Sequence, residues 1–238
     1  MNIAIRIQHT SSRPRHLLLL MESLKRCYEK TSLADLDFQV FTDDSGTSWG
    51  GLKGLIESID SDPTHVLVIQ DDVIVCKEFL QTVEKIVELH PDKTISFFSP
   101  YQEIEKAIRR RQSFIQVDVF YYAQAYVMPI DKVKDFYWFS AEHISPKITQ
   151  DDRRLAMYHL YHQDPVWVTA PSLVEHLAWD TTTTSSEKGQ LPKLKQEART
   201  ARRFIGLENS GLDLDWSKPP QITAMPGDFQ MQFRKYLV

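Results

Sequence analysis

The sequence predicts an α/β protein built on an open, mainly parallel β-sheet with helices on its faces. Strand-like and helix-like segments alternate through the first half of the chain, an order typical of a parallel sheet. One strand-like segment, HVLVIQ at 65–70, is almost continuously apolar, which indicates a strand covered by helices on both faces. Ligands of such sheets bind beyond the carboxyl ends of the strands. Those ends are therefore where functional residues are expected.

Hydrophobic periodicity and proline positions define the individual elements. Residues 3–8 alternate apolar and polar side chains as a strand does, and Pro14 precedes a segment with helical spacing. Pro91 closes another helix-like segment. On these criteria we expect strands at 3–8, 37–44, 64–72, 94–99 and 116–129, helices at 15–30, 52–59, 77–91 and 151–163, and a strand running into a loop at 166–177.

Composition sets the broad class of the protein. Hydrophobic residues make up 42% of the chain and charged residues 25%, values that are ordinary for a folded soluble protein and exclude a disordered one. No apolar run approaches the roughly 18 residues that cross a membrane. The first residues enter a strand pattern directly and lack the parts of a signal peptide. We expect a cytoplasmic protein without a membrane partner, in which Cys27 and Cys76, outside any CxxC spacing, are reduced thiols.

Domain organisation follows from length and from a change in composition. A chain of 238 residues fits one large domain or two small ones. No second core pattern and no internal repeat is evident, and from residue 181 the composition turns polar and rich in proline. We expect a core domain at 1–180 and a C-terminal lid or tail at 181–238 packed on it, in a monomer or weak oligomer.

Two adjacent carboxylates stand at the end of the most apolar strand. Asp71 and Asp72 follow the run VLVIQ, and burying two neighbouring carboxylates without partners would be strongly unfavourable. A divalent metal ion that carries phosphate oxygens would satisfy them, because Mg²⁺ and Mn²⁺ prefer carboxylate and phosphate oxygens. The alternative is that both aspartates cap the next helix or turn toward water.

Two further acid pairs stand at the ends of expected elements. Asp43 and Asp44 end the second expected strand, next to the small residues of SGTSWGG, which let a ligand approach the backbone. Asp151 and Asp152 begin the last expected helix. Each pair alone is also explained as a helix cap. Three acid pairs at the element ends of one α/β chain favour a common site.

The segments that carry these acids resemble those of GT-A-fold nucleotide-sugar glycosyltransferases. VFTDDSGTSWGGLKGLI resembles the segment whose aspartate contacts the nucleotide base, and HVLVIQDDVIVCKEFL resembles the metal-binding acidic motif. TQDDRRLAMYHLY is similar to the later motif that supplies the catalytic base of inverting members, and APSLVEHL to the loop whose histidine closes on metal and diphosphate. The four segments follow the family's order and imply a GT-A (Rossmann-like) sheet.

The resemblance implies a nucleotide-binding set. Asp43 would accept a hydrogen bond from the uracil of a UDP-sugar, with Asp44 and Trp49 beside the nucleotide. Asp71 would touch the ribose or the metal ion.

The resemblance also implies a metal site and a base. Asp72 and His176 would hold Mn²⁺ or Mg²⁺ against the diphosphate. Asp152 would be the general base of an inverting transfer, with Asp151 as its neighbour or as the alternative base.

Three residues near these motifs complete the expectation. His9 and Arg13 join the nucleotide-sugar-binding set, although a lone histidine is more often structural and surface charge explains Arg13 equally well. Gln70 stands where the family's acidic motif has an acid, so it lowers the local negative charge and leaves the metal's ligands open.

A narrower resemblance concerns the acceptor. IAIRIQHTSSR, VIQDDVIVCKEFL, YYAQAYVMP, PSLVEHL, ARRFIG and LDLDW are similar to small bacteriophage-encoded glycosyltransferases associated with hydroxymethylated pyrimidines in DNA. This resemblance implies a UDP-sugar donor, a duplex DNA acceptor and a location in the bacterial host cytoplasm. The alternatives are a transferase acting on lipopolysaccharide, capsule glycan or protein, and a nucleotide-sugar-binding module without catalysis.

Two basic patches suit a nucleic-acid acceptor. The formal net charge of −4 excludes a wholly basic surface, but positive charge concentrates at Arg109, Arg110 and Arg111 and again at Arg202 and Arg203. We expect these arginines to contact DNA phosphates, while a solvated helix face explains each patch equally well.

Overall fold

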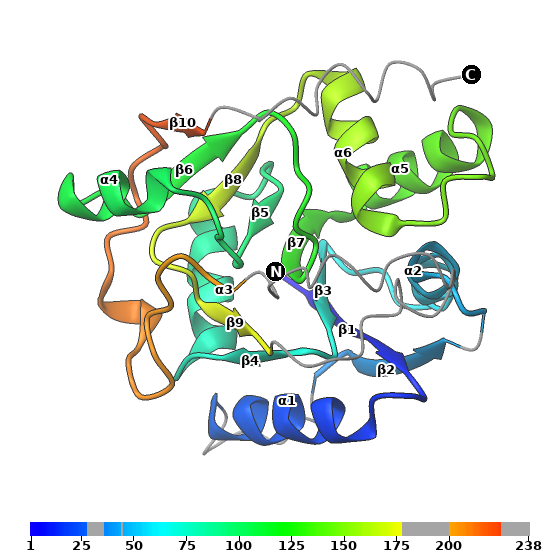
Figure 1. Ribbon diagram of the computed structural model, residues 1–238, viewed down its shortest axis with the longest axis horizontal. Coiled ribbons are helices and arrows are strands. Elements are labelled where there is room, and N and C mark those ends of the chain that lie inside the picture. The colour runs from blue at the N-terminus through cyan, green and yellow to red at the C-terminus, as the bar shows by residue number, and fades with distance from the viewer. Residues whose placement is uncertain (28–35, 44, 178–199, 225–238) are drawn as a thin grey trace, which may run out of the picture.

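The computed structural model describes residues 1–27, 36–43, 45–177 and 200–224. It confirms a mixed α/β fold with one large sheet flanked by helices (Figure 1). The eight strands of this sheet lie in the order β10-β6-β8-β5-β7-β3-β1-β2. Four of its seven neighbouring pairs are parallel and three are antiparallel.

A parallel βαβαβ unit forms one end of the sheet. β1 (Ile3–Thr10) lies between β2 (Phe38–Asp43) and β3 (His65–Gln70), and both pairings are parallel. α1 (Pro14–Cys27) and α2 (Ser48–Glu57) connect these strands in turn. Because the strands run in the same direction, their carboxyl ends meet at one edge, where the first two acid pairs were expected.

The other strands extend the sheet beyond β3. β7 runs antiparallel to both β3 and β5, and β6 runs antiparallel to β8. A separate two-stranded sheet joins β4 to β9. The remaining strands are β4 (Val73–Val75), β5 (Ile95–Ser96), β6 (Phe114–Val117), β7 (Ala125–Pro129), β8 (Val166–Thr169), β9 (Val174–His176) and β10 (Thr223–Ala224). The remaining helices are α3 (Phe79–Leu89), α4 (Glu103–Arg109), α5 (Ile130–Glu142) and α6 (Asp151–His162).

Hydrophobic cores cover both faces of the sheet. Val66 and Val68 of β3 belong to a cluster with apolar side chains of α2, α5 and α6. Leu67 and Ile69 belong to a second cluster with side chains of α1 and α3. The alternation of β3 thus sends successive side chains into two cores. The unbroken apolar run of this strand follows from burial on both sides.

The strand expected at 116–129 is wrong as a single element. The structure has β6 and β7 there, separated by residues 118–124, and α5 follows at once. β8 and β5 lie between β6 and β7 in the sheet. The chain therefore leaves the sheet between two positions that are not neighbours, which a local pattern of strand-forming residues does not reveal.

The described part of the C-terminal region packs on the same sheet. β10 pairs with β6, and the buried indole of Trp216 donates a hydrogen bond to Gly211 O at 2.8 Å. The division of the chain at residue 181 stays a prediction. No helix in the described ranges is long and apolar enough to cross a membrane.

Candidate functional site

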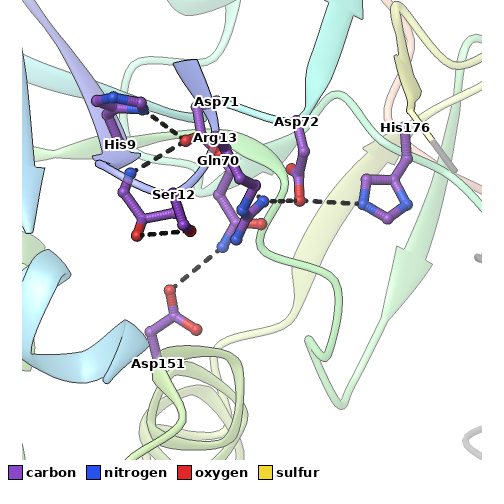
Figure 2. Close-up of polar contacts among 9 residues, drawn as sticks. His9, Ser12, Arg13, Gln70, Asp71, Asp72, Asp151 and His176 are labelled. Carbon is purple, nitrogen blue, oxygen red and sulfur yellow. Dashed lines mark hydrogen bonds and ion pairs between the residues drawn. The ribbon is translucent and has the colours of Figure 1, made fainter. Parts of the chain in front are cut away.

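Strand register brings the Asp71–Asp72 pair to the edge of the sheet. Gln8 of β1 lies opposite Gln70 of β3, and Asp71 N donates to Gln8 O at 3.0 Å. The next residues of the two strands, His9 and Asp71, consequently lie side by side. The His9 Nδ1 to Asp71 Oδ2 distance is 2.7 Å (Figure 2).

Asp71 is fully enclosed by partners from β1 and the loop after it. Its side chain is 2% exposed, and Oδ2 also accepts a hydrogen bond from Thr10 N at 3.0 Å. Oδ1 lies 3.1 Å from Nη1 of Arg13. Burial raises the pKa of Asp71, although the charge of Arg13 and the Thr10 N–H oppose the rise. Asp71 therefore anchors the loop that carries Arg13.

Arg13 joins the two carboxylates of this pair. The same Nη1 atom that contacts Asp71 also pairs with Oδ2 of Asp72, as Figure 2 shows. The Arg13 side chain is 10% exposed, and its Nε has no hydrogen-bond partner among the described residues. A buried guanidinium therefore compensates the charge of two adjacent carboxylates.

Pairing of β4 with β9 places His176 beside Asp72. His176 lies opposite Val73 in this antiparallel pair, and Leu177 N donates to Asp72 O at 2.7 Å. His176 Nε2 lies 3.3 Å from Asp72 Oδ2. Burial alone would raise the pKa of Asp72, but the hydrogen bond and charge of His176 and the charge of Arg13 hold this pKa below its usual value.

Asp72 and His176 fit a divalent ion as a site with two protein ligands. Oδ1 of Asp72 is buried and has no hydrogen-bond partner within the described part of the chain, which leaves a hard oxygen ligand available. No group of three or more His, Cys, Asp or Glu side chains suited to a metal ion occurs in the described ranges. A bound ion would need its remaining ligands from a bound substrate and water.

Asp151 occupies a second, separate carboxylate centre. It is the first residue of α6 and is 4% exposed. Its N–H donates to Ser48 Oγ at 3.1 Å, and its Oδ2 accepts from Gln70 Nε2 at 3.3 Å (Figure 2). Gln8 Nε2 donates to Ser48 O at 2.7 Å, so β1 is joined to the start of α2 beside Asp151. Burial raises the pKa of Asp151 despite the hydrogen bonds from Ser48 and its other neighbours.

Asp152 lies next to this centre in a more open position. It is partly exposed, its N–H donates to Asp151 Oδ1 at 2.8 Å, and its own Oδ1 accepts from Arg153 N at 2.6 Å. Arg153 Nε in turn donates to the Tyr121 hydroxyl at 3.4 Å. The two acids of the pair thus have different surroundings although they are adjacent in sequence.

Asp43 lies at the same edge, at the end of β2. It is opposite Thr10 of β1, and its Oδ1 accepts from Ser45 N at 2.7 Å. Gly51 of α2 approaches closely, since a Cβ there would lie 3.0 Å from Asp43 Cβ and 3.1 Å from Gln8 Nε2. Glycine therefore permits the helix to pack at this edge. Asp44 lies outside the described residues.

Trp49 is partly buried against the helices behind the site. Its ring centroid lies 5.8 Å from that of Phe136 in α5, and the Arg154 guanidinium lies 4.5 Å from the centroid of its ring. Trp49 N donates to Thr149 O at 2.9 Å. These contacts fix the start of α2 against α6, which also sets Ser48 beside Asp151.

The two basic patches converge on one helix. Arg109 is the last residue of α4, and the exposed side chains of Arg110 and Arg111 follow it directly. Arg202 and Arg203 lie 4.0 Å and 3.9 Å from the carboxylate of Glu105, one turn earlier in α4. Arg202 and Arg203 therefore lie beside α4, the helix that ends at Arg109.

Backbone and ring contacts connect the Arg202 segment to His176. Arg202 N donates to Ser99 O at 2.8 Å. The neighbouring Phe98 ring has its centroid 6.0 Å from that of His176. A short chain of contacts thus runs from the backbone of Arg202 to the His176 ring.

Sequence reasoning missed Gln8 and Ser48 as members of the site. Gln8 is the last polar residue of the alternating pattern at 3–8, and it pairs with Gln70 of β3. Its polar side chain at the end of an expected strand was the signal that could have identified it. Ser48 gave none, because its place depends on the packing of α2 against α6.

The chain was also compared with known proteins. No protein-family model and no curated protein matches it. Among solved structures it is similar to S. aureus TarS 1-349, with a TM-score of 0.46 and 11% identity over 72% of this chain and 58% of that one. For TarS 1-349 in complex with UDP-GlcNAc the TM-score is 0.47 at 10% identity, over 79% of this chain and 62% of that one. The chain thus spans less than two thirds of these TarS chains, and the chemistry of its site rests on its own residues.

Proposed function

We propose that the protein is a glycosyltransferase that moves a sugar from a UDP-sugar to the hydroxyl of a hydroxymethylated pyrimidine in duplex DNA. The main support for this proposal is that acidic residues far apart in sequence lie together at one edge of the sheet. Asp43, Asp71 with Asp72, and Asp151 with Asp152 all lie at the edge formed by the carboxyl ends of β1, β2 and β3. This is the edge at which open α/β sheets bind nucleotides.

The donor would lie across the ends of β1 and β2. Asp43 is the acceptor for a uracil N–H, beside the start of α2. His9 and Asp71 hold the β1 end and the loop after it, so that Arg13 faces the strand ends. A buried guanidinium with an unpartnered Nε is suited to a diphosphate oxygen.

The leaving group is a nucleoside diphosphate, whose developing negative charge needs cationic stabilisation. Arg13 supplies one fixed positive charge between Asp71 and Asp72. Asp72 and His176 would hold Mn²⁺ or Mg²⁺, which when bound would add positive charge at the diphosphate. Asp72 thus contacts Arg13 and would also bind the metal ion.

The transfer step needs a base on the acceptor side. A carboxylate of the Asp151–Asp152 pair takes the proton of the acceptor hydroxyl, and the oxygen forms a bond to the anomeric carbon. The bond from that carbon to the diphosphate oxygen breaks, and its electron pair leaves with UDP. A single direct displacement of this kind inverts the anomeric configuration.

The basic surface on α4 supports a polyanionic acceptor. Arg109, Arg110, Arg111, Arg202 and Arg203 would contact phosphates, which position a duplex without reading its sequence. A hydroxymethyl group at C5 of a pyrimidine lies in the major groove, and base flipping is a second route to it.

Mass spectrometry of acceptor DNA tests the proposal. The chain is incubated with UDP-glucose, UDP-galactose or UDP-GlcNAc and Mn²⁺, on matched duplexes that contain hydroxymethylcytosine, hydroxymethyluracil or the unmodified bases. A gain of one hexosyl or N-acetylhexosaminyl mass on a hydroxymethylated duplex alone is the expected result. If the UDP-sugar is hydrolysed but no duplex gains mass, DNA is not the acceptor. If no UDP-sugar is bound or turned over, the protein is not a glycosyltransferase that uses these donors.

A further inference from the structure

We propose that Asp151, and not Asp152, is the general base, and that Gln70 is the residue that positions its carboxylate. This inference rests on the proposed transfer reaction. Gln70 is not one of the expected acidic residues, because it stands where the acidic motif has an acid. The structure connects Gln70 to the other carboxylate centre.

Donors on two sides orient the Asp151 carboxylate. Oδ2 accepts from Gln70 Nε2 at 3.3 Å, and Oδ1 accepts from Asp152 N at 2.8 Å. A carboxylate oxygen has two lone pairs, so one of these hydrogen bonds does not use its full accepting capacity. In Figure 2 the carboxylate points from α6 toward the strand ends that carry Asp71 and Asp72. A base held in this way meets the requirement that its geometry be fixed before the reaction.

The charge of Asp151 is not neutralised within the described residues. Asp71 and Asp72 share the Arg13 guanidinium, whereas no ion pair in the described ranges includes Asp151. Its neighbours are neutral donors from three other elements, and burial raises its pKa. A buried carboxylate without a cation binds a proton more strongly than an exposed one, which suits a base.

Asp152 has the opposite character. It is partly exposed, and its Oδ1 is held by the backbone N–H of Arg153 at 2.6 Å. This is a hydrogen bond within the first turn of α6, typical of an acid that stabilises a helix start. The backbone N–H of Asp152 donates a hydrogen bond that helps to hold the Asp151 carboxylate in position.

An amide at position 70 separates two acidic centres. Gln70 directly precedes Asp71 and reaches Asp151 from the other side. A glutamate here would set a carboxylate against Asp151 Oδ2 and disfavour its charged form. The other groups that face Asp151 are Gln8 of β1, Ser48 of α2 and the buried Tyr126 of β7, whose pKa is raised by burial and by the charge of Asp151. Gln70 thus supplies a donor where an acid would repel.

Paired variants separate the two acids. Asp151→Asn should lower kcat for transfer by roughly 100-fold to 10,000-fold with donor binding intact, and this loss should be at least roughly 10-fold larger than the loss in Asp152→Asn. The opposite ranking would overturn the choice of base. UDP binding measured by calorimetry and a thermal unfolding scan show that each variant is folded.

Two substitutions test Gln70. Gln70→Leu should lower kcat roughly 10-fold to 100-fold with little change in the donor KM, in line with other residues that orient a reactive group. Gln70→Glu should move the acidic limb of the kcat–pH profile to higher pH. Gln116→Glu is the matched control, because Gln116 Nε2 also donates to an aspartate, Asp118 Oδ1, at 3.4 Å but on β6. An unchanged pH profile in Gln70→Glu would overturn the positioning role.

A donor-free measurement keeps this inference separate from the proposed function. Carbon-13 NMR of labelled aspartates should show one carboxyl that is absent in Asp151→Asn and titrates at higher pH in Gln70→Glu than in wild type. If that shift occurs but no sugar is transferred, the pair exists and the proposed function fails, together with the role as a base. If transfer occurs without that shift, the function stands and the role of Gln70 is wrong.

Discussion

Nε2 of His176 lies 3.3 Å from Oδ2 of Asp72, and each of the two side chains is only 11% exposed. They meet because β4, which follows Asp72, pairs with β9, which ends at His176. The contact depends on a two-stranded sheet outside the main one. Residues more than a hundred positions apart in sequence thereby form one candidate ligand pair.

Removal of Asp72 should eliminate metal-stimulated turnover. Asp72→Ala takes away the candidate ligand with an unpartnered buried oxygen, and with it one partner of His176. We expect the rate increase on adding Mn²⁺ to disappear, as measured by UDP release across a Mn²⁺ series after treatment with EDTA. His162→Ala is the control, because His162 faces Asp135 at 3.5 Å on the surface of α5 and α6. A full Mn²⁺ response in Asp72→Ala would remove Asp72 from the metal site.

Loss of the Arg13 charge should destabilise the fold strongly. Arg13→Gln leaves Asp71 and Asp72 as adjacent buried carboxylates, and loss of one partner of a buried ion pair costs about 3–5 kcal/mol. Urea denaturation of Arg13→Gln and of the exposed control Arg15→Gln measures the difference. Mn²⁺ should restore part of the stability in Arg13→Gln, because an ion that binds only the folded state stabilises it. A midpoint equal to that of Arg15→Gln would contradict the bridging role.

The fold was predictable where one local pattern determines an element. The apolar run at 66–69 identified β3 and its burial on both faces, since successive side chains of a strand point to opposite faces and all four are apolar. The segment at 116–129 defeated the same criterion. Aromatic and β-branched residues continue there through residues 118–124, which lie outside the sheet, and the positions of β6 and β7 depend on pairings with distant strands.

The site was predictable as a place more than as a set of contacts. Acids after parallel strands must meet at one edge, so Asp43 and Asp71 follow from topology alone. The bridge by Arg13 and the hydrogen bond from Gln70 to Asp151 depend on side-chain reach between elements. Trp49 illustrates the same limit, because its contacts with Phe136 and Arg154 follow from helix packing.

Substitution of Arg202 and Arg203 should weaken DNA binding and flatten its salt dependence. Each phosphate contact contributes about 0.9 to the slope of log K against log salt, so loss of two contacts lowers the slope by about 2. Fluorescence anisotropy with a short duplex across a salt series measures this change for Arg202→Ala/Arg203→Ala. The control Lys25→Ala/Arg26→Ala removes the same charge from exposed positions on α1. Equal slopes in both double variants would dissociate the α4 surface from DNA.

Asp164 should stabilise the fold above about pH 4. Burial would raise its pKa, but hydrogen bonds from His159 and Lys132 and their charges lower it to about 2 from an ordinary 3.8. The unfolded chain therefore binds more protons between these values, and the stabilisation is lost as the pH falls through them. At neutral pH Asp164→Asn should cost about 2 kcal/mol of unfolding free energy, measured by urea denaturation. A pH-independent difference between variant and wild type would contradict this assignment.

Asp151→Asn should show the opposite sign and become more stable as it loses activity. Burial raises the folded-state pKa of Asp151, so the folded chain holds a proton that the unfolded chain has already released. Wild-type stability therefore falls as the pH rises from the ordinary value of 3.8 through the folded-state pKa, and an asparagine removes that loss. Urea denaturation from pH 4.5 to pH 8.5 should show Asp151→Asn gaining on wild type with rising pH. Replacing a carboxylate that stabilises the fold lowers the free energy of unfolding, whereas replacing one that serves catalysis at a cost in stability raises it. A lower stability of Asp151→Asn at neutral pH would therefore show that Asp151 has a structural role.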